Sequence, residues 1–126
     1  MAKYVDGFVL VVPKKNIAAY KKMAREGKAM WMKYGALDYK ECMGDDLAVK
    51  ANSGWKPRSF KDMAKAKQGD TVWFSFIVYK SRKHRDQVNK KVMGQMNKEM
   101  EKYKDFQMPF DMKRFSYGGF TVEVDK

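Results

Sequence analysis

The sequence contains a single cysteine, Cys42, and a single histidine, His84. One cysteine cannot form a disulfide within the chain, so nothing requires an oxidising compartment. There is no His–carboxylate pair at ligand spacing and no Gly-rich phosphate loop after a strand, so we expect neither a metal nor a cofactor. No apolar run approaches the roughly 20 residues that span a bilayer, and the run 8–12 is too short for a secretory signal. These absences predict a cytoplasmic protein without membrane contact.

The length of 126 residues predicts one domain, residues 1–126. A chain of this length buries about two-thirds of its unfolded surface. The hydrophobic share is 44%, and eight Phe, seven Tyr and three Trp provide the bulky side chains of a core. This composition argues against disorder over most of the chain.

The hydrophobic pattern occurs twice. Residues 5–13 and 71–79 are long runs of β-branched and aromatic residues, and a lysine-rich segment with helical periodicity follows each run. Two further strands are predicted at 36–43 and 114–124, and a short helix at 60–65 within the long connection between the second and third strands. This order predicts an α+β fold of the split βαβ type, with a four-stranded antiparallel sheet and two helices on one face.

Each predicted long helix has one apolar stripe, through which it should pack on the sheet. The stripe of the first helix consists of Ile17, Tyr20, Ala24, Gly27, Trp31 and Tyr34. The stripe of the second consists of His84, Val88, Val92, Met96, Met100 and Tyr103. Gly35 is placed to end the first helix, and Ser81 is placed to cap the start of the second.

The two long strands are apolar on both faces, since side chains alternate along a strand. In the run 71–79, one face carries Val72, Phe74, Phe76 and Val78, and the other carries Trp73, Ile77 and Tyr79. Two helices cover only one face of a sheet, and a broad apolar face is unfavourable in water. We therefore expect a homodimer in which a second copy covers the other face.

The formal net charge is +12, and most of the excess lies on the two predicted helices. Such a surface attracts polyanions by counterion release, and the attraction weakens as salt rises. Lysine is poor at directed recognition. The charge is therefore consistent either with a solvated surface or with weak, salt-sensitive binding of nucleic acid.

The segment 74–79 is similar to part of the third-strand signature of the RNA-recognition motif, whose element order is the same. Val72 and Trp73 stand where that signature has a basic residue and a glycine, and the first strand lacks the partner signature. We therefore interpret Phe74 and Phe76 as core or interface residues.

Few side chains suggest chemistry. Asp6 interrupts an apolar strand, where a carboxylate needs a partner or a cavity, and Arg114 is the candidate partner. His84 and Cys42 are candidate acid–base groups, although each also fits a packing role.

Several segments resemble the YbaA-like family of small bacterial proteins of unknown function. They include Tyr4-Val5-Asp6-Gly7-Phe8-Val9, Glu41-Cys42, Gly44-Asp45-Asp46, Met108-Pro109-Phe110-Asp111, Lys113-Arg114 and Tyr117-Gly118-Gly119-Phe120. The resemblance extends over essentially the whole chain. It implies a ferredoxin-like βαββαβ fold in the dimeric α/β-barrel superfamily, in which two sheets pack face to face. It implies no particular reaction.

Two functional hypotheses follow. In the first, a homodimer binds a small organic molecule in a cavity between sheet and helices, and cofactor-independent catalysis stays open. Asp6 and Arg114 would be polar anchors, Trp73 and Tyr117 aromatic walls, and His84 or Cys42 the catalytic groups. In the alternative, a non-catalytic protein binds polyanions or nucleic acid through its lysine-rich helices.

Overall fold

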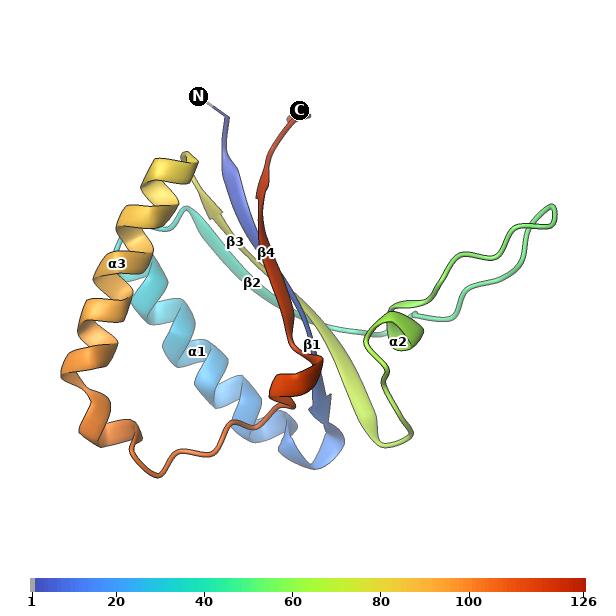
Figure 1. The fold of residues 1–126 in the computed structure, drawn as a ribbon, viewed down its shortest axis with the longest axis horizontal. Helices are drawn as coiled ribbons and strands as arrows, with labels where there is room; N and C mark the ends of the chain where they lie inside the picture. Colours follow the sequence, from blue (N-terminus) through green and yellow to red (C-terminus); the bar gives the residue numbers. More distant parts are fainter. Residues whose placement is uncertain (1) are drawn as a thin grey trace.

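One antiparallel sheet lies at the centre of the α+β fold (Figure 1). The computed structural model describes residues 2–126. The sheet contains β1 (Tyr4–Pro13), β2 (Asp38–Met43), β3 (Asp70–Tyr79) and β4 (Ser116–Thr121), in the order β2-β3-β1-β4. The two long strands pair in its middle, from Tyr4 opposite Tyr79 to Pro13 opposite Asp70. The predicted four-stranded antiparallel sheet is confirmed. Strand β4 is shorter than expected because a turn of 3-10 helix precedes it.

Two helices, α1 (Ile17–Lys33) and α3 (Arg82–Lys98), cover one face of the sheet (Figure 1). Both bury residues of their predicted stripes, namely Tyr20, Ala24, Val88 and Val92. The helix layer is therefore held to the sheet by the residues that the periodicity identified.

No helix within residues 2–126 combines the length and the apolar character needed to cross a bilayer.

The predicted helix ends are also found. The Ser81 hydroxyl accepts a hydrogen bond from the His84 backbone N–H at 3.1 Å, which caps α3. Gly35 follows α1 with a φ of 110°, a conformation that glycine adopts without strain. The predicted apolar stripe of the second helix, however, extends beyond the end of that helix. Helix α3 ends at Lys98, and the largely exposed Met100 belongs to a separate turn of 3-10 helix, because the chain turns at Glu99.

The face of the sheet away from α1 and α3 is covered at one end only. There, helix α2 (Phe60–Met63) and its flanking segments bury Val11 and Val72 against Ala64. Towards the other end, Phe74 and Phe120 are 48% and 62% exposed. Within residues 2–126, this chain therefore supplies only part of the cover that the apolar pattern requires.

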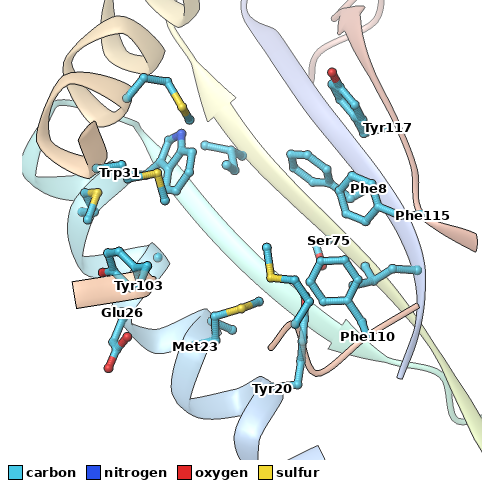
Figure 2. A pocket seen from close by; sticks show the side chains of 18 of the residues that line it. Phe8, Tyr20, Met23, Glu26, Trp31, Ser75, Tyr103, Phe110, Phe115 and Tyr117 are labelled. Carbon is cyan, nitrogen blue, oxygen red and sulfur yellow. The ribbon is translucent and has the colours of Figure 1, made fainter. Parts of the chain in front are cut away.

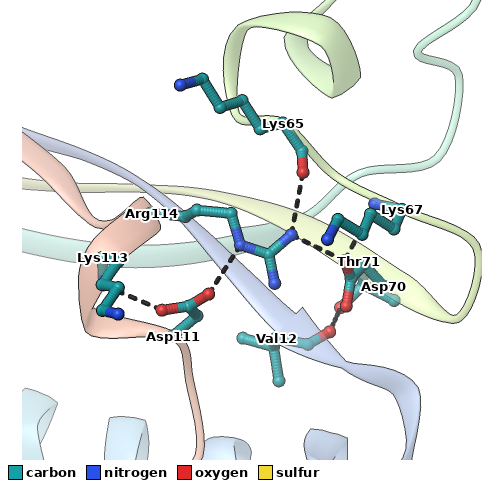
Figure 3. A network of polar contacts seen from close by, with 8 residues as sticks. All are labelled: Val12, Lys65, Lys67, Asp70, Thr71, Asp111, Lys113 and Arg114. Atoms are coloured by element: carbon teal, nitrogen blue, oxygen red, sulfur yellow. Dashed lines mark hydrogen bonds and ion pairs between the residues drawn. The ribbon is translucent and has the colours of Figure 1, made fainter.

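Arg114 joins the start of β4 to the start of β3 (Figure 3). Its Nη1 donates hydrogen bonds to Asp70 Oδ2 at 2.8 Å and to the Lys65 carbonyl oxygen at 2.9 Å, and its Nε donates to Asp111 Oδ2 at 2.8 Å. The network ties together two segments that are far apart in the sequence, 65–70 and 111–114.

The predicted pairing of Asp6 with Arg114 is wrong. Asp6 lies opposite Gly119 in the sheet, whereas Arg114 is held by Asp70 at the opposite end of β1, next to Pro13. The partner of Asp6 is Arg85 of α3, at 2.8 Å. Sequence position alone could not show that α3 begins beside this carboxylate.

Gly119 is needed because the Tyr4 ring lies against it. A Cβ on Gly119 would come within 2.7 Å of the Tyr4 ring, whereas on Gly118 it would meet only the exposed Phe120 ring at 3.8 Å. We expect Gly119→Ala to lower the free energy of unfolding by about 2 kcal/mol, since a buried ring must shift. The matched control Gly118→Ala should stay within about 0.5 kcal/mol of the wild type. Equal effects in urea unfolding would contradict this interpretation.

Replacing Arg114 should destabilise the protein in a pH-dependent way. Arg114→Ala leaves the nearly buried Asp70 without its cation, so we expect a loss of about 2 kcal/mol at pH 7. A backbone hydrogen bond from Lys67 and the Arg114 side chain hold the pKa of Asp70 below its ordinary value, and Arg114 does the same for Asp111. Carboxyls with a lowered folded-state pKa stabilise above their unfolded pKa, about 3.9, and lose that contribution as pH falls.

The stability difference between wild type and Arg114→Ala should therefore narrow below about pH 4. Urea unfolding at pH 7, 5 and 3 measures this difference. Lys113→Ala is the matched control, because it removes the same charge from an exposed neighbouring side chain and should change stability little at any of these pH values. A difference that stays constant with pH would show that the ion pairs contribute nothing.

Candidate functional site

A cavity of about 1120 Å³ lies between the sheet and its two helices (Figure 2). Helix α3 is buried on the sheet at Val88 and Val92, and beyond Val92 its residues are exposed or half-buried. Helix α1 packs on a separate cluster around Tyr20 and Trp73. The connection from α3 to β4 borders the space between these two contacts and contributes Tyr103 and Phe110 to its lining.

The walls of the cavity are mainly aromatic and methionine side chains. They come from every layer of the fold and include Phe8, Met23, Trp31, Tyr103, Phe110 and Tyr117 (Figure 2). The rings of Phe8, Phe115 and Tyr117 stack side by side, with centroids 5.7–6.0 Å apart. These rings form a continuous aromatic wall along β1 and β4.

A buried ion pair forms one polar point of the lining. The Asp6 carboxylate is 4% exposed and accepts a hydrogen bond from Arg85 Nη1 at 2.8 Å. The Arg85 guanidinium lies 4.9 Å from the centre of the Tyr4 ring, and its Nε donates to Asp86. Burial raises the pKa of the Asp6 carboxyl, and Arg85 offsets only part of that rise. The opposite charges of Asp6 and Arg85 therefore offset each other within the pair.

Asn89 of α3 connects this region to α1 and β3. Its side-chain oxygen accepts hydrogen bonds from Trp31 Nε1 at 3.0 Å and from the Tyr79 hydroxyl at 3.3 Å. The indole of Trp31 is thereby fixed at the cavity wall.

The second polar point is Glu41 of β2, whose carboxylate accepts three hydroxyl hydrogen bonds. Oε1 accepts from the Tyr20 hydroxyl at 2.7 Å and from the Ser75 hydroxyl, and Oε2 accepts from the Tyr39 hydroxyl at 2.8 Å. Burial and the negative charge of Glu41 raise the pKa of both tyrosines, so both keep their protons and act as donors. A carboxylate held in this way can accept a further hydrogen bond or a proton from a bound molecule.

Local sequence explains how this cluster forms. Tyr39 and Glu41 are two residues apart in β2, so both side chains lie on its helix-facing side. Ser75 lies directly opposite Glu41 on β3. Gly27 of α1 allows the approach of the Tyr39 hydroxyl, because a Cβ there would lie 3.0 Å from its oxygen.

The expected ligand-binding residues are only partly brought together. Asp6 and Tyr117 line the cavity. Trp73 is buried behind Tyr20, with ring centroids 4.8 Å apart, and Arg114 belongs to the separate network at the start of β3; neither lines the cavity.

The two expected catalytic groups also lie outside the cavity. His84 Nδ1 accepts the Lys80 backbone N–H at 2.9 Å, and burial, together with Lys80 and Lys91, lowers the pKa of its imidazole. Cys42 is exposed on the opposite face of the sheet, since it alternates with Glu41. Within residues 2–126, no group of three His, Cys, Asp or Glu side chains could hold a metal ion.

Sequence reasoning missed Glu41 and Arg85. A signal for Glu41 was present, because it lies two residues from Tyr39 on the same, buried side of a strand, where a carboxylate needs hydrogen-bond donors. Arg85-Asp86 is also among the segments that resemble the YbaA-like family, but the many basic residues on the second helix gave no reason to assign Arg85 to the site.

Two solved structures cover 98% of this chain but share little with it. The de novo designed protein Foldit4 has a TM-score of 0.41 and 7% sequence identity, with 99% of that chain covered. A Bacillus cereus protein related to NIF3 has a TM-score of 0.36 and 13% identity, with 27% of that chain covered. Both scores are too low to bear on fold or function.

The sequence comparisons are decisive. The chain is 37% identical over 124 residues to the uncharacterized protein YbaA of Escherichia coli K12 and to that of Shigella flexneri, covering 98% of this chain and 99% of each relative. The family model described as "Protein of unknown function (DUF1428)" matches residues 3–112. The resemblance to the YbaA-like family is confirmed. The chain is a relative of the YbaA proteins and belongs to the DUF1428 family.

Proposed function

We propose that the protein binds a small, largely apolar organic molecule in the cavity between the sheet and its helices. The observation that carries this proposal is the cavity itself, with a volume of about 1120 Å³ and mainly apolar walls. Ligand pockets are typically about 300–1,000 Å³, apolar, and equipped with a few convergent polar groups. The Asp6–Arg85 pair and Glu41 are such groups.

The methionines favour an adaptable site. Met23, Met30, Met93 and Met96 line the cavity from both helices. Methionine is unbranched and polarizable, so it can follow the shape of different apolar molecules at small cost. The ligand need not fill the cavity completely to be held.

The second part of the proposal is a ferredoxin-like homodimer in which two sheets pack face to face as an α/β barrel. The strand order β2-β3-β1-β4, with both helices on one face, supports this arrangement. The exposed Phe74 and Phe120 on the other face support it as well, since a second copy would bury them.

The position of the connection between β2 and α2 is consistent with a face-to-face homodimer. It projects on the side of the sheet away from α1 and α3 (Figure 1), where a second copy would lie. Near its tip Asn52 and Trp55 pair across a tight turn, and Trp55 is 66% exposed. An exposed indole beside an open sheet face suits contact with a partner.

For a cofactor-independent reaction in the cavity, Glu41 and the Asp6–Arg85 pair are the candidate acid–base groups, because they are the less exposed charged groups of its lining. Neither His84 nor Cys42 belongs to the cavity lining. Asp6 is held in an ion pair with Arg85, whereas Glu41 accepts hydrogen bonds from neutral hydroxyls.

The exposed lysines support a second proposal, weak binding of polyanions by the outer surface of the helices. Lys21, Lys22 and Lys28 of α1, with Lys90 and Lys91 of α3, are exposed. Binding through them would weaken as salt rises, whereas a neutral molecule in an apolar cavity would be held equally at low and moderate salt.

A neutral fluorescent probe tests the cavity. N-phenyl-1-naphthylamine should bind with a rise in fluorescence, and Met23→Glu should weaken binding at least tenfold, or about 1.4 kcal/mol. Met23 lies at the cavity wall (Figure 2), and a carboxylate there would be poorly solvated beside the probe.

Met63→Glu is the control for this experiment, because Met63 is exposed on α2 and lies outside the cavity lining. It makes the same change of side chain and charge and should bind the probe like the wild type. Thermal melting checks that both variants are folded. The cavity proposal fails if the wild type does not bind the probe, or if folded Met23→Glu binds it equally well.

Sedimentation equilibrium tests the pairing. We expect a dimer for the wild type and a monomer for Phe74→Asp, because a charge buried between two apolar sheets is strongly unfavourable. Phe106→Asp is the matched control: Phe74 and Phe106 are 48% and 49% exposed, but Phe106 lies on the helix side, in the connection after α3. A monomeric wild type, or a dimer that survives Phe74→Asp, would overturn the face-to-face arrangement.

A further inference from the structure

One hydrogen-bond acceptor position of Glu41 is used by none of the residues that the structure describes, 2–126. An ionised carboxylate offers about four lone-pair positions on its two oxygens. Tyr20 and Ser75 use both positions on Oε1, and Tyr39 uses one on Oε2. Because Glu41 is half-buried in the cavity lining, the remaining position on Oε2 is available to a molecule in the cavity.

Glu41 also has no cationic partner. Within residues 2–126, no Lys or Arg nitrogen lies within 4.0 Å of its carboxylate, whereas Asp6 pairs with Arg85 at 2.8 Å. Three neutral hydroxyls stabilise the charge of Glu41 but do not neutralise it. A carboxylate taken partly out of water gains most from a donor that is itself charged.

The charge of the cavity lining is opposite in sign to that of the protein. Its acidic residues are Asp6, Glu26, Glu41 and Glu101, and its basic residues are Arg85 and Lys104. The whole chain, in contrast, has a formal net charge of +12. The cavity lining therefore has more acidic than basic residues, which disfavours an anionic ligand.

Aromatic rings stand next to Glu41. The Tyr39 and Trp31 rings both line the cavity, with centroids 6.3 Å apart, and the hydroxyl of Tyr39 is bonded to Glu41. A cation beside a carboxylate and near aromatic faces is attracted by both, through charge and through the ring quadrupoles.

From these observations we propose that Glu41 binds a protonated amine, so that the ligand is an organic ammonium ion with an aromatic or other apolar body. This inference rests on the proposed function of the cavity and names the chemical class of its ligand. The ammonium group would donate to Oε2 of Glu41, and the apolar body would lie against the rings of Phe8, Phe115 and Tyr117.

A matched series of three probes tests the proposal: 1-naphthylmethylamine, 1-naphthylmethanol and 1-naphthylacetate. Each displaces N-phenyl-1-naphthylamine from the wild type at pH 7, where the first is a cation and the last an anion. We expect the amine to bind at least tenfold more tightly than the alcohol, and the acetate to bind most weakly. An amine that binds no more tightly than the alcohol would overturn the proposal.

Glu41→Gln should remove the advantage of the amine and leave the affinity for the alcohol within about threefold, since the amide keeps the shape but not the charge. Glu26→Gln is the matched control, because Glu26 is an exposed acidic residue of the same lining outside the hydroxyl cluster. It should preserve the order of the three probes. Loss of the amine preference in Glu26→Gln as much as in Glu41→Gln would assign the effect to overall charge and overturn the role of Glu41.

The outcomes separate this inference from the proposed function. Binding of the neutral probe without a preference for the amine overturns the ammonium site but leaves the apolar cavity as a binding site. Failure of every probe to bind overturns both. If Glu41→Gln does not fold, the wild-type series still tests the preference for a cation, and loss of that preference in Glu26→Gln would still overturn the role of Glu41.

Discussion

The buried ion pair between Asp6 and Arg85 fixes the position of α3 on the sheet. A carboxylate within an apolar strand is strongly unfavourable unless a cation and hydrogen-bond donors reach it. Arg85 lies in the first turn of α3, so the pair holds the start of the helix beside β1, and Val88 and Val92 then pack below it. The rest of the helix carries Met93, Gly94, Met96 and polar residues, none of which is buried.

The cavity follows from this one-ended attachment. At the other end of the sheet, Tyr20 and Trp73 fill the space between α1 and β3. Between the two packed ends, α1 stays in contact with β2 through Tyr20 and Gly27, whereas α3 has no buried residue beyond Val92, and long flexible or aromatic side chains form the boundary of the cavity there. A cavity of this kind is compatible with stability because α1 and the start of α3 remain packed on the sheet.

The sequence was sufficient for most of the fold but for less of the site. Runs of β-branched and aromatic residues over 5–13 and 71–79 identified the central strands, and the 3.6-residue periodicity identified the buried Tyr20, Ala24, Val88 and Val92, because these patterns reflect contacts that every such sheet and helix must make. The partner of Asp6 depends on a tertiary contact between residues 79 positions apart. With basic side chains so abundant, composition could not select Arg85 over Arg114.

The same limit explains why Cys42 and His84 attracted attention and Glu41 did not. Rare residue types stand out in a sequence, but the reactive character of a group depends on where its neighbours in space lie. Glu41 is one of fifteen acidic residues, and only the folded chain shows that Tyr20, Tyr39 and Ser75 converge on it from three elements. Cys42 is its neighbour in the strand and points to the other side of the sheet.

The two polar points of the cavity differ in a way that separates structure from binding. Asp6 and Arg85 carry opposite charges 2.8 Å apart, so the pair presents little net charge to a ligand. Glu41 is organised by neutral hydroxyls, which fix its orientation without cancelling its charge. The net charge of +12 repels cations at long range, but salt at physiological strength screens that field beyond about 8 Å. At hydrogen-bond distance the nearest charge dominates, so a cavity with an unneutralised carboxylate can select a cation within a protein that is basic overall.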